Sequence, residues 1–227
     1  MRKYLYMSEE IARKHTSLTH DSEKKLLDFL AKVIYKFLSA DSLSIIGLLG
    51  LIFSGLCLVL AGKNIFFLLL SPLGLFINWF GDSLDGRVAR LRNAYRPKAG
   101  YYIDKFIDTL GIISIALGVE FSLLTLKPYW MYALILALLI MVHVFLRAGI
   151  SKVMELNLGI FGPTELRIIS ITFLFILYLS KNPVYFNKFI GYYTLLDFAG
   201  AIFCIALAIA LGISVYKTLW GKYRIKE

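Results

Sequence analysis

The sequence predicts an all-α membrane protein in which six transmembrane helices follow an amphipathic helix at the cytoplasmic membrane surface. Three observations lead to this fold class. Of the 227 residues, 59% are hydrophobic and 18% are charged, whereas a soluble domain is about 45–50% apolar and about 25% charged. The apolar residues form blocks about as long as the ~20 residues that a helix needs to cross a bilayer. The basic residues gather between alternate blocks, as they do on the cytoplasmic side of membrane proteins.

This composition argues against soluble enzymes with a buried metal, nucleic-acid binders and disulfide-stapled secreted modules. The formal net charge of +10 would suggest nucleic acid in a soluble protein. Here we attribute it to membrane topology and expect no nucleic-acid partner. The two cysteines, Cys57 and Cys204, both lie inside apolar blocks, and we interpret them as small hydrophobic residues.

Residues 1–40 are predicted to form a cytoplasmic arm, and residues 41–227 the transmembrane domain. Within the arm, apolar residues such as Leu27, Leu30 and Ile34 recur at helical spacing opposite lysines such as Lys25 and Lys32. A helix with this pattern lies in the headgroup layer of a membrane. The alternative is a basic amphipathic helix that is exposed to solvent and binds a partner protein.

Six apolar blocks are predicted to span the membrane: residues 43–62, 65–80, 101–123, 129–146, 168–179 and 192–215. If the N-terminus lies in the cytoplasm, the arm, residues 81–100, residues 147–167 and the tail after residue 215 face inward. These segments, with Lys105 just inside the third block, hold all but four of the 25 Lys and Arg residues. We therefore expect an integral protein of the cell membrane with both termini in the cytoplasm. Asp197, near the outer end of the sixth block, is expected to cap a helix or to pair locally.

Four carboxylates lie near membrane depth on the cytoplasmic side: Asp82, Asp85, Asp104 and Asp108. An ionised carboxylate near hydrocarbon costs about 2.5–3.5 kcal/mol, so four of them need a shared compensating charge. If the second helix continues past its apolar block, Asp82 and Asp85 share one helix face, and Asp104 and Asp108 share a face at the start of the third helix. Because the link between the two helices is short, we expect these faces to meet and the carboxylates to converge.

Convergent carboxylates bind hard cations through oxygen, and a cluster of four can hold two Mg²⁺ or Mn²⁺ ions. Such a metal pair clamps a diphosphate, orients it for in-line attack and stabilises the leaving phosphate. Gly86 and Ala89, between the acids, leave room for a bulky ligand near the helix backbone. The alternative is that the carboxylates pair with nearby basic residues, such as Arg87 and Lys105, in a solvated loop.

The same residues form one continuous motif: Asp82, Asp85, Gly86, Ala89 and Arg90, then nine residues, then Gly100, Asp104 and Asp108. This string resembles the signature of the CDP-alcohol phosphotransferase (CDP-alcohol phosphatidyltransferase) family, DxxDGxxARx₈₋₉GxxxDxxxD, at every fixed position. The resemblance implies transfer of a phosphoryl-alcohol group, of phosphatidyl type, from a CDP-linked donor to the hydroxyl of an acceptor alcohol. CMP is released, and the product belongs to phospholipid biosynthesis. The family resemblance also implies a homodimer.

The resemblance implies roles for single residues. Asp82, Asp85 and Asp104 resemble the family's metal ligands, and Asp108 resembles the general base, which also touches a metal. The positions that resemble nucleotide-binding residues are Gly86, Ala89, Arg90 and Gly100. Many relatives begin the first span with Pro-Asn and a Thr that reaches toward the nucleotide. This chain has Asp41 and Ser44 in that region, and we expect these two residues to replace those contacts.

A second basic group suggests an acceptor site. Arg147, Lys152 and Arg167 lie at the cytoplasmic ends of the fourth and fifth spans and in the loop between them. This segment loosely resembles the acceptor-lining segment of prokaryotic phospholipid-forming members. Since arginine grips phosphate or carboxylate through a bidentate fork, we expect an anionic polar acceptor, such as an inositol phosphate, glycerol phosphate or serine. The alternative is that the three residues only anchor the chain to lipid headgroups.

Two other functions would also use clustered carboxylates that bind cations. Intramembrane Mg²⁺-dependent prenyltransferases also hold a diphosphate with aspartates, but they usually need two separated Asp-rich motifs and more spans. A cation carrier would place its carboxylates near the bilayer midplane, flanked by broken helices in repeated halves. Here the acids occupy one stretch at the cytoplasmic edge and the chain shows no repeat, so both alternatives are disfavoured.

Overall fold

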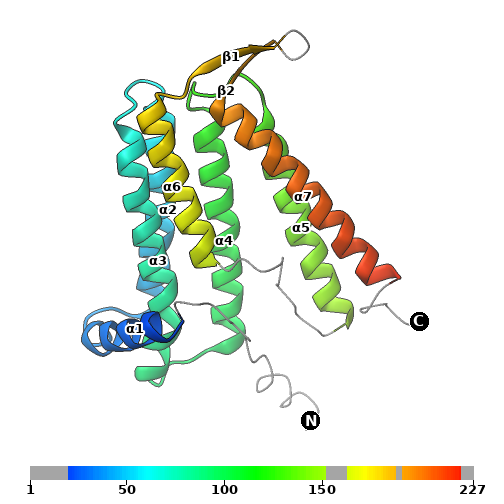
Figure 1. Ribbon diagram of the computed structural model, residues 1–227. Helices are drawn as coiled ribbons and strands as arrows, with labels where there is room; N and C mark the ends of the chain where they lie inside the picture. The colour runs from blue at the N-terminus through cyan, green and yellow to red at the C-terminus, as the bar shows by residue number, and fades with distance from the viewer. Residues whose placement is uncertain (1–19, 152–162, 188–190, 221–227) are drawn as a thin grey trace.

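The computed structural model describes residues 20–151, 163–187 and 191–220, most of which are helical (Figure 1). The elements in chain order are α1 (His20–Ile34), α2 (Ala40–Ala61), α3 (Phe67–Leu91), α4 (Pro97–Glu120), α5 (Tyr129–Ser151), α6 (Pro163–Ser180), β1 (Val184–Asn187), β2 (Gly191–Thr194) and α7 (Leu195–Leu219). A helix therefore occupies each of the six predicted blocks, and another lies in the arm.

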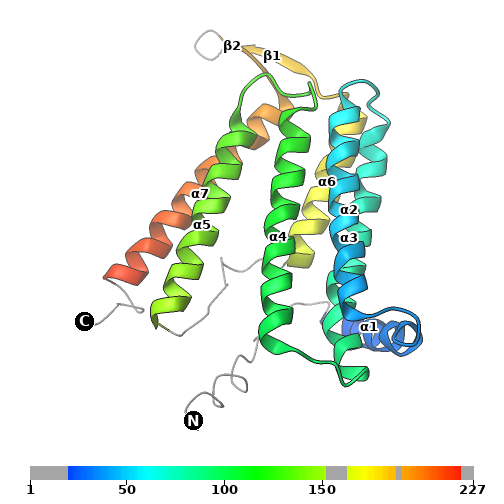
Figure 2. The same ribbon diagram turned by 180° about the vertical axis from the view of Figure 1, so that it is seen from behind.

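The helices form one elongated bundle. α2 packs against α3 and α4, α3 packs against α6, and α5 packs against α4 and α7. Figures 1 and 2 show that α5 and α7 diverge from α4 and α6 toward the end of the bundle where α3 ends and α4 begins. We call this the α3–α4 end, and the opposite end, which carries β1 and β2, the hairpin end. α1 lies crosswise at the α3–α4 end (Figure 1).

Glycine contacts explain why α2, α3 and α4 approach each other so closely. A β-carbon on Gly50 of α2 would lie 2.7 Å from the carbonyl oxygen of Gly74 in α3. One on Gly118 of α4 would lie 2.5 Å from the carbonyl oxygen of Gly55 in α2. Small residues at helix crossings let backbones pack tightly, which is a main source of helix association in lipid. This three-helix core fixes the relative positions of α3 and α4.

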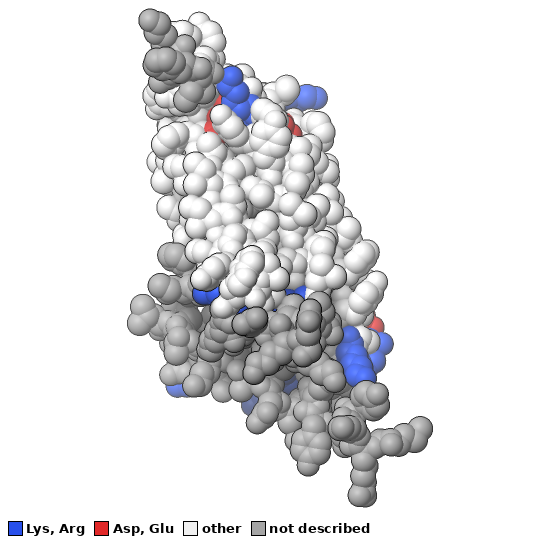
Figure 3. All heavy atoms as spheres, turned by 90° about the vertical axis from the view of Figure 1, so that its right-hand side faces the viewer, with Lys and Arg blue, Asp and Glu red and all other residues white. Residues whose placement is uncertain are grey.

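Within the described residues, four helices are long and apolar enough to cross a membrane: α2, α3, the Tyr129–Arg147 part of α5, and α7. Figure 3 shows a broad band without charged side chains on one face of the molecule. These are features of an integral membrane protein. Two of the six predicted spans fall short by this measure. α4 carries Asp104, Lys105 and Asp108 in its first half, and α6 is apolar only over the shorter stretch Leu166–Ser180.

The hairpin is a feature that the sequence prediction missed. β1 and β2 pair antiparallel, with Val184 opposite Thr194, and the rings of Phe186 and Tyr192 lie 5.0 Å apart between centroids. The sixth helix was expected from residue 192, but α7 begins at Leu195 because Thr194 caps it. The side chain of Thr194 accepts a hydrogen bond from the backbone N–H of Asp197, and the Asp197 carboxylate accepts one from the N–H of Thr194. This confirms the prediction that Asp197 caps a helix.

Candidate metal centre and active site

The predicted motif lies on the last turns of α3 and the first turns of α4. α3 continues as helix to Leu91, well past the end of the predicted apolar block, so the spacing of Asp82 and Asp85 does place them on one helix. α4 begins with Pro97 in its first turn, where a proline has no helical N–H bond to lose. The connection between the helices is only residues 92–96, and it brings α3 and α4 together as antiparallel neighbours.

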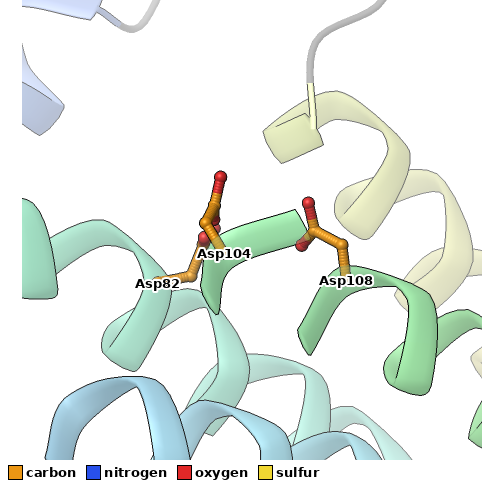
Figure 4. A group of neighbouring side chains, drawn as sticks. All are labelled: Asp82, Asp104 and Asp108. Carbon is orange, nitrogen blue, oxygen red and sulfur yellow. The ribbon is translucent and has the colours of Figure 1, made fainter. Parts of the chain in front are cut away.

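Three of the four predicted carboxylates converge. Asp82 of α3 and Asp104 and Asp108 of α4 each offer a carboxylate oxygen, and these oxygens lie within 4.8 Å of one another. Figure 4 shows that the three side chains point to the same side of the two helices. All three residues are half-buried. Carboxylate oxygens at this spacing are a donor set that suits Mg²⁺ or Mn²⁺. We call this group the aspartate cluster.

Two basic side chains compensate the aspartate cluster. The Lys105 ammonium lies 2.9 Å from a carboxylate oxygen of Asp104 and 2.6 Å from one of Asp108. The Arg167 guanidinium, from α6, donates to the carboxylate of Asp82 at 2.8 Å. Repulsion between two carboxylates within 4.8 Å is at least about 3 kcal/mol at an effective dielectric constant of about 20. The two basic side chains therefore supply part of the positive charge that the cluster requires.

The fourth carboxylate, Asp85, is held differently. One of its oxygens accepts a hydrogen bond from the Ser44 hydroxyl at 2.8 Å, and the other accepts one from the N–H of Gly86 at 2.5 Å. Ser44 belongs to α2, and Asp85 is not among the three residues whose carboxylate oxygens lie within 4.8 Å of one another. It nevertheless lines the same small pocket as Asp82 and Asp104.

That pocket lies between α2, α3 and α4. Its lining residues are Ser44, Gly47, Asn78, Asp82, Asp85, Asp104 and Ile107. Asn78 is buried one turn before Asp82 on α3. Its side-chain oxygen accepts a hydrogen bond at 2.9 Å from the Arg167 guanidinium, the same group that donates to Asp82. Arg167 is thus held by two side chains of α3, and α6 is tied to the pocket.

The glycines of the motif differ from those of the three-helix core. A β-carbon on Gly86 or on Gly100 would meet no atom of its surroundings within 4 Å. Protein packing therefore does not require glycine at either position, and both leave open space at the α3–α4 end. The neighbouring Ala89 is buried, and the guanidinium of Arg90 lies 5.1 Å from the centre of the Tyr95 ring.

The remaining predicted site residues lie outside this constellation or outside the described part of the chain. Asp41, expected near the nucleotide, pairs at 2.6 Å with Arg96, and both side chains are more than half exposed. Arg147 is buried on the last part of α5. Lys152, the third predicted acceptor residue, lies outside the described residues.

Two residues of the constellation were not singled out from the sequence as site residues. Lys105 was expected to pair with the carboxylates only in the alternative in which they form no metal site, although its place between Asp104 and Asp108 on one helix is a signal for direct pairing. Asn78 lies four residues before Asp82, on the same helix face, within a block that is apolar except for Ser71 and Asn78. A buried amide in such a block needs a hydrogen-bond partner, and that requirement was the available signal.

Comparison with models of known protein families gave a match. The family model for CDP-alcohol phosphatidyltransferases matches residues 37–216, which include the complete motif and most of the chain. The protein therefore belongs to the CDP-alcohol phosphatidyltransferase family. A comparison with curated proteins gave no match.

Proposed function

We propose that this family member is a metal-dependent enzyme that transfers a phosphatidyl-type group from a CDP-linked lipid to the hydroxyl of an anionic acceptor. The main support is the aspartate cluster, in which three motif carboxylates from two helices lie within 4.8 Å of one another. In the reaction, the acceptor oxygen forms a bond to the phosphorus attached to the lipid alcohol. The bond from that phosphorus to the oxygen bridging the two phosphates breaks, and CMP leaves.

In this proposal Asp82, Asp104 and Asp108 hold two divalent cations. Asp85 of α3, which is hydrogen-bonded to Ser44 of α2, adds a fourth carboxylate ligand. When bound, such ions neutralise the diphosphate and stabilise the leaving phosphate. Asp108 takes the proton of the acceptor hydroxyl, because among the cluster residues it lies one turn deeper on α4 than Asp104 and corresponds to the general base of the motif. Lys105 and Arg167 pair with the same carboxylates.

The CDP part of the donor occupies the open space in front of Gly86 and Gly100. A β-carbon at either position would project into that space without touching the protein, so glycine is better explained by the approach of a ligand than by packing. Ala89 and Arg90 border the same turns of α3. Ser44 orients Asp85 from α2, and Asp41 with Arg96 forms an exposed ion pair at the rim.

The acceptor binds on the side of α6. Arg167 comes from this helix and reaches the aspartate cluster through Asp82, so its guanidinium is close enough to contact an anionic acceptor near the reacting phosphate. Arg147 and Lys152 complete the basic group in this proposal. Arg167→Ala should raise the KM for the acceptor and leave the donor KM nearly unchanged. A rise in the donor KM alone would instead assign Arg167 to the diphosphate.

All six long helices cross the membrane in this proposal, with the α3–α4 end in the cytoplasm. The distribution of basic residues along the sequence supports this orientation. A cysteine introduced near Lys127, in the α4–α5 connection, should react with an impermeant thiol reagent added outside intact cells. A cysteine introduced near Tyr95 should be protected. The reverse pattern of labelling would contradict the orientation.

The test of the reaction is CMP release by the purified protein. CDP-diacylglycerol is incubated with each of a panel of acceptors, including inositol phosphate, glycerol phosphate and serine, with Mg²⁺ or with EDTA. We expect acceptor-dependent CMP release that EDTA abolishes and Mg²⁺ or Mn²⁺ restores. A parallel incubation contains a prenyl diphosphate as the donor. Release of inorganic diphosphate there, with no CMP from CDP-diacylglycerol, would favour the prenyltransferase alternative.

A further inference from the structure

α1 is attached to the part of α3 that carries the motif. One face of α1 is fully packed, since Leu27 and Ala31 are buried in a cluster with Leu84 and Val88 of α3 and Leu43 of α2. Leu84 and Val88 alternate along α3 with the motif positions Asp82, Asp85, Gly86 and Ala89. Any displacement of α1 therefore acts on the backbone segment that positions the α3 carboxylates.

Polar contacts strengthen this attachment. The Asp28 carboxylate of α1 lies 3.0 Å from the guanidinium Nε of Arg87, which is a residue of the motif segment. The Nε of Arg92, just after α3, donates to the backbone carbonyl of Tyr35 at 2.5 Å. α1 and the turn after it are thus joined to the end of α3 by apolar packing, one ion pair and one charged hydrogen bond.

A second face of α1 is apolar but exposed. Leu26, Phe29 and Val33 follow one another at helical spacing, and Phe37 lies in the turn that follows α1. Phe29 and Phe37 are 64% and 79% exposed. Lys25 and Lys32 lie alongside this stripe on α1, and Lys36 lies in the following turn; all three are exposed. Four large exposed apolar side chains next to three lysines are unfavourable in water but match the surface of an anionic membrane.

The direction of α1 agrees with that match. It lies crosswise to the long helices at the α3–α4 end (Figure 1). If those helices cross the bilayer, α1 is roughly parallel to the membrane plane, and its exposed stripe can enter the headgroup layer along its whole length.

We propose that α1 is a sensor of anionic lipid that is coupled to the active site. Its apolar stripe inserts into the headgroup layer, Lys25, Lys32 and Lys36 bind anionic headgroups, and this docking holds residues 81–91 of α3 in the conformation that presents Asp82 and Asp85. The inference rests on the proposed membrane orientation, but it does not depend on the identity of the reaction. Each lysine near an anionic surface contributes about a fivefold increase in membrane affinity.

Two measurements on the full chain test the proposal. A polarity-sensitive fluorophore is attached to Phe29→Cys in a Cys57→Ala, Cys204→Ala background, and the protein is reconstituted into vesicles of phosphatidylcholine with or without phosphatidylglycerol. We expect a blue shift of emission on adding phosphatidylglycerol. In the same vesicles, amide hydrogen exchange of residues 81–91 should become slower.

Variants separate the outcomes. The triple variant Lys25→Gln, Lys32→Gln, Lys36→Gln should lose both responses to phosphatidylglycerol. The matched control Lys63→Gln, Lys127→Gln, Lys181→Gln, with its substitutions toward the hairpin end, should keep them.

A probe that reports water in both vesicles would overturn the proposal and favour a protein partner for this face. A blue shift without slower exchange would overturn the coupling. CMP release is measured separately, so a protein that releases no CMP but shows both responses would count against the proposed reaction alone.

Discussion

A single carboxylate at one end of the bundle and the aspartate cluster at the other end are held in different ways. At the hairpin end, Asp197 is fully buried and accepts hydrogen bonds from the backbone N–H groups of Leu126, Lys127 and Thr194 at 2.8–3.1 Å. The Thr194 hydroxyl adds a further bond at 3.1 Å. At the α3–α4 end, the aspartate cluster is instead balanced by the side chains of Lys105 and Arg167.

The difference separates a structural carboxylate from carboxylates that can bind a ligand. Backbone amides are fixed by the helix and turn that contain them, so Asp197 cannot exchange its partners without local unfolding. Lysine and arginine stand on long flexible stems and can move away when another cation arrives. Asp197 should therefore contribute to stability, and the aspartate cluster to activity.

The largest expected effect is on activity in the aspartate cluster. Asp108→Asn should lower kcat by about 10²–10⁴-fold, because the acceptor hydroxyl would lose the proposed general base. Asp104→Asn should abolish turnover through loss of metal binding. Thermal unfolding in detergent should be little changed in both variants, since Asn removes like-charge repulsion along with the partner of Lys105. Full CMP release by either variant would contradict the assignment of the cluster.

The opposite result is expected at the hairpin end. Asp197→Asn removes a buried carboxylate that accepts hydrogen bonds from four donor groups. The substitution should reduce the free energy of unfolding by roughly 2 kcal/mol or more. The folded fraction should keep its kcat. If this variant were inactive while unfolding at the wild-type temperature, the distinction between the two ends would be wrong.

Two glycines, one in close helix packing and one in front of open space, should also differ in the effect of substitution. Gly118→Ala would place a β-carbon 2.5 Å from the Gly55 carbonyl oxygen and should cost about 1–3 kcal/mol of stability. Gly100→Ala meets open space, and it should leave stability unchanged or raise it by up to about 1 kcal/mol. Gly100→Ala should nevertheless lower the affinity for the CDP donor, which a donor titration of CMP release would measure. Unchanged donor KM in that variant would remove the argument that the space is for the nucleotide.

The smallest expected effect concerns Lys105. Lys105→Met should reduce stability in EDTA by about 1 kcal/mol, because Asp104 and Asp108 lose their nearest positive charge. Saturating Mg²⁺ should remove most of this difference, while Lys105→Arg should behave like the wild type. An equal loss of stability with and without Mg²⁺ would show that Lys105 acts only in packing.

Much of the site was predictable because it depends on local spacing. The intervals between Asp82 and Asp85 and between Asp104 and Asp108 fit one helix face, and both pairs do lie on continuous helices. The convergence of Asp82 with the α4 pair follows from the short α3–α4 link. These features need only helical periodicity and chain connectivity, which a single sequence contains.

Other features depend on contacts between distant segments, and periodicity does not determine them. The hydrogen bond to Asp85 comes from Ser44, which is 41 residues earlier in the chain. The pairing of Arg167 with Asp82 spans 85 residues. The hairpin was missed because Tyr192 and Tyr193 continue the apolar run of α7. The Thr194 and Asp197 spacing was a local signal for a helix start at that point.

The most direct test of the central claim is a titration of the purified protein with Mn²⁺, followed by electron paramagnetic resonance. The wild type should bind two Mn²⁺ ions per chain, and Asp82→Asn and Asp104→Asn should lose this binding. The folded fraction of Asp197→Asn should bind Mn²⁺ like the wild type. Absence of Mn²⁺ binding by the wild type, or undiminished binding by Asp104→Asn, would contradict the claim that the aspartate cluster is a metal centre.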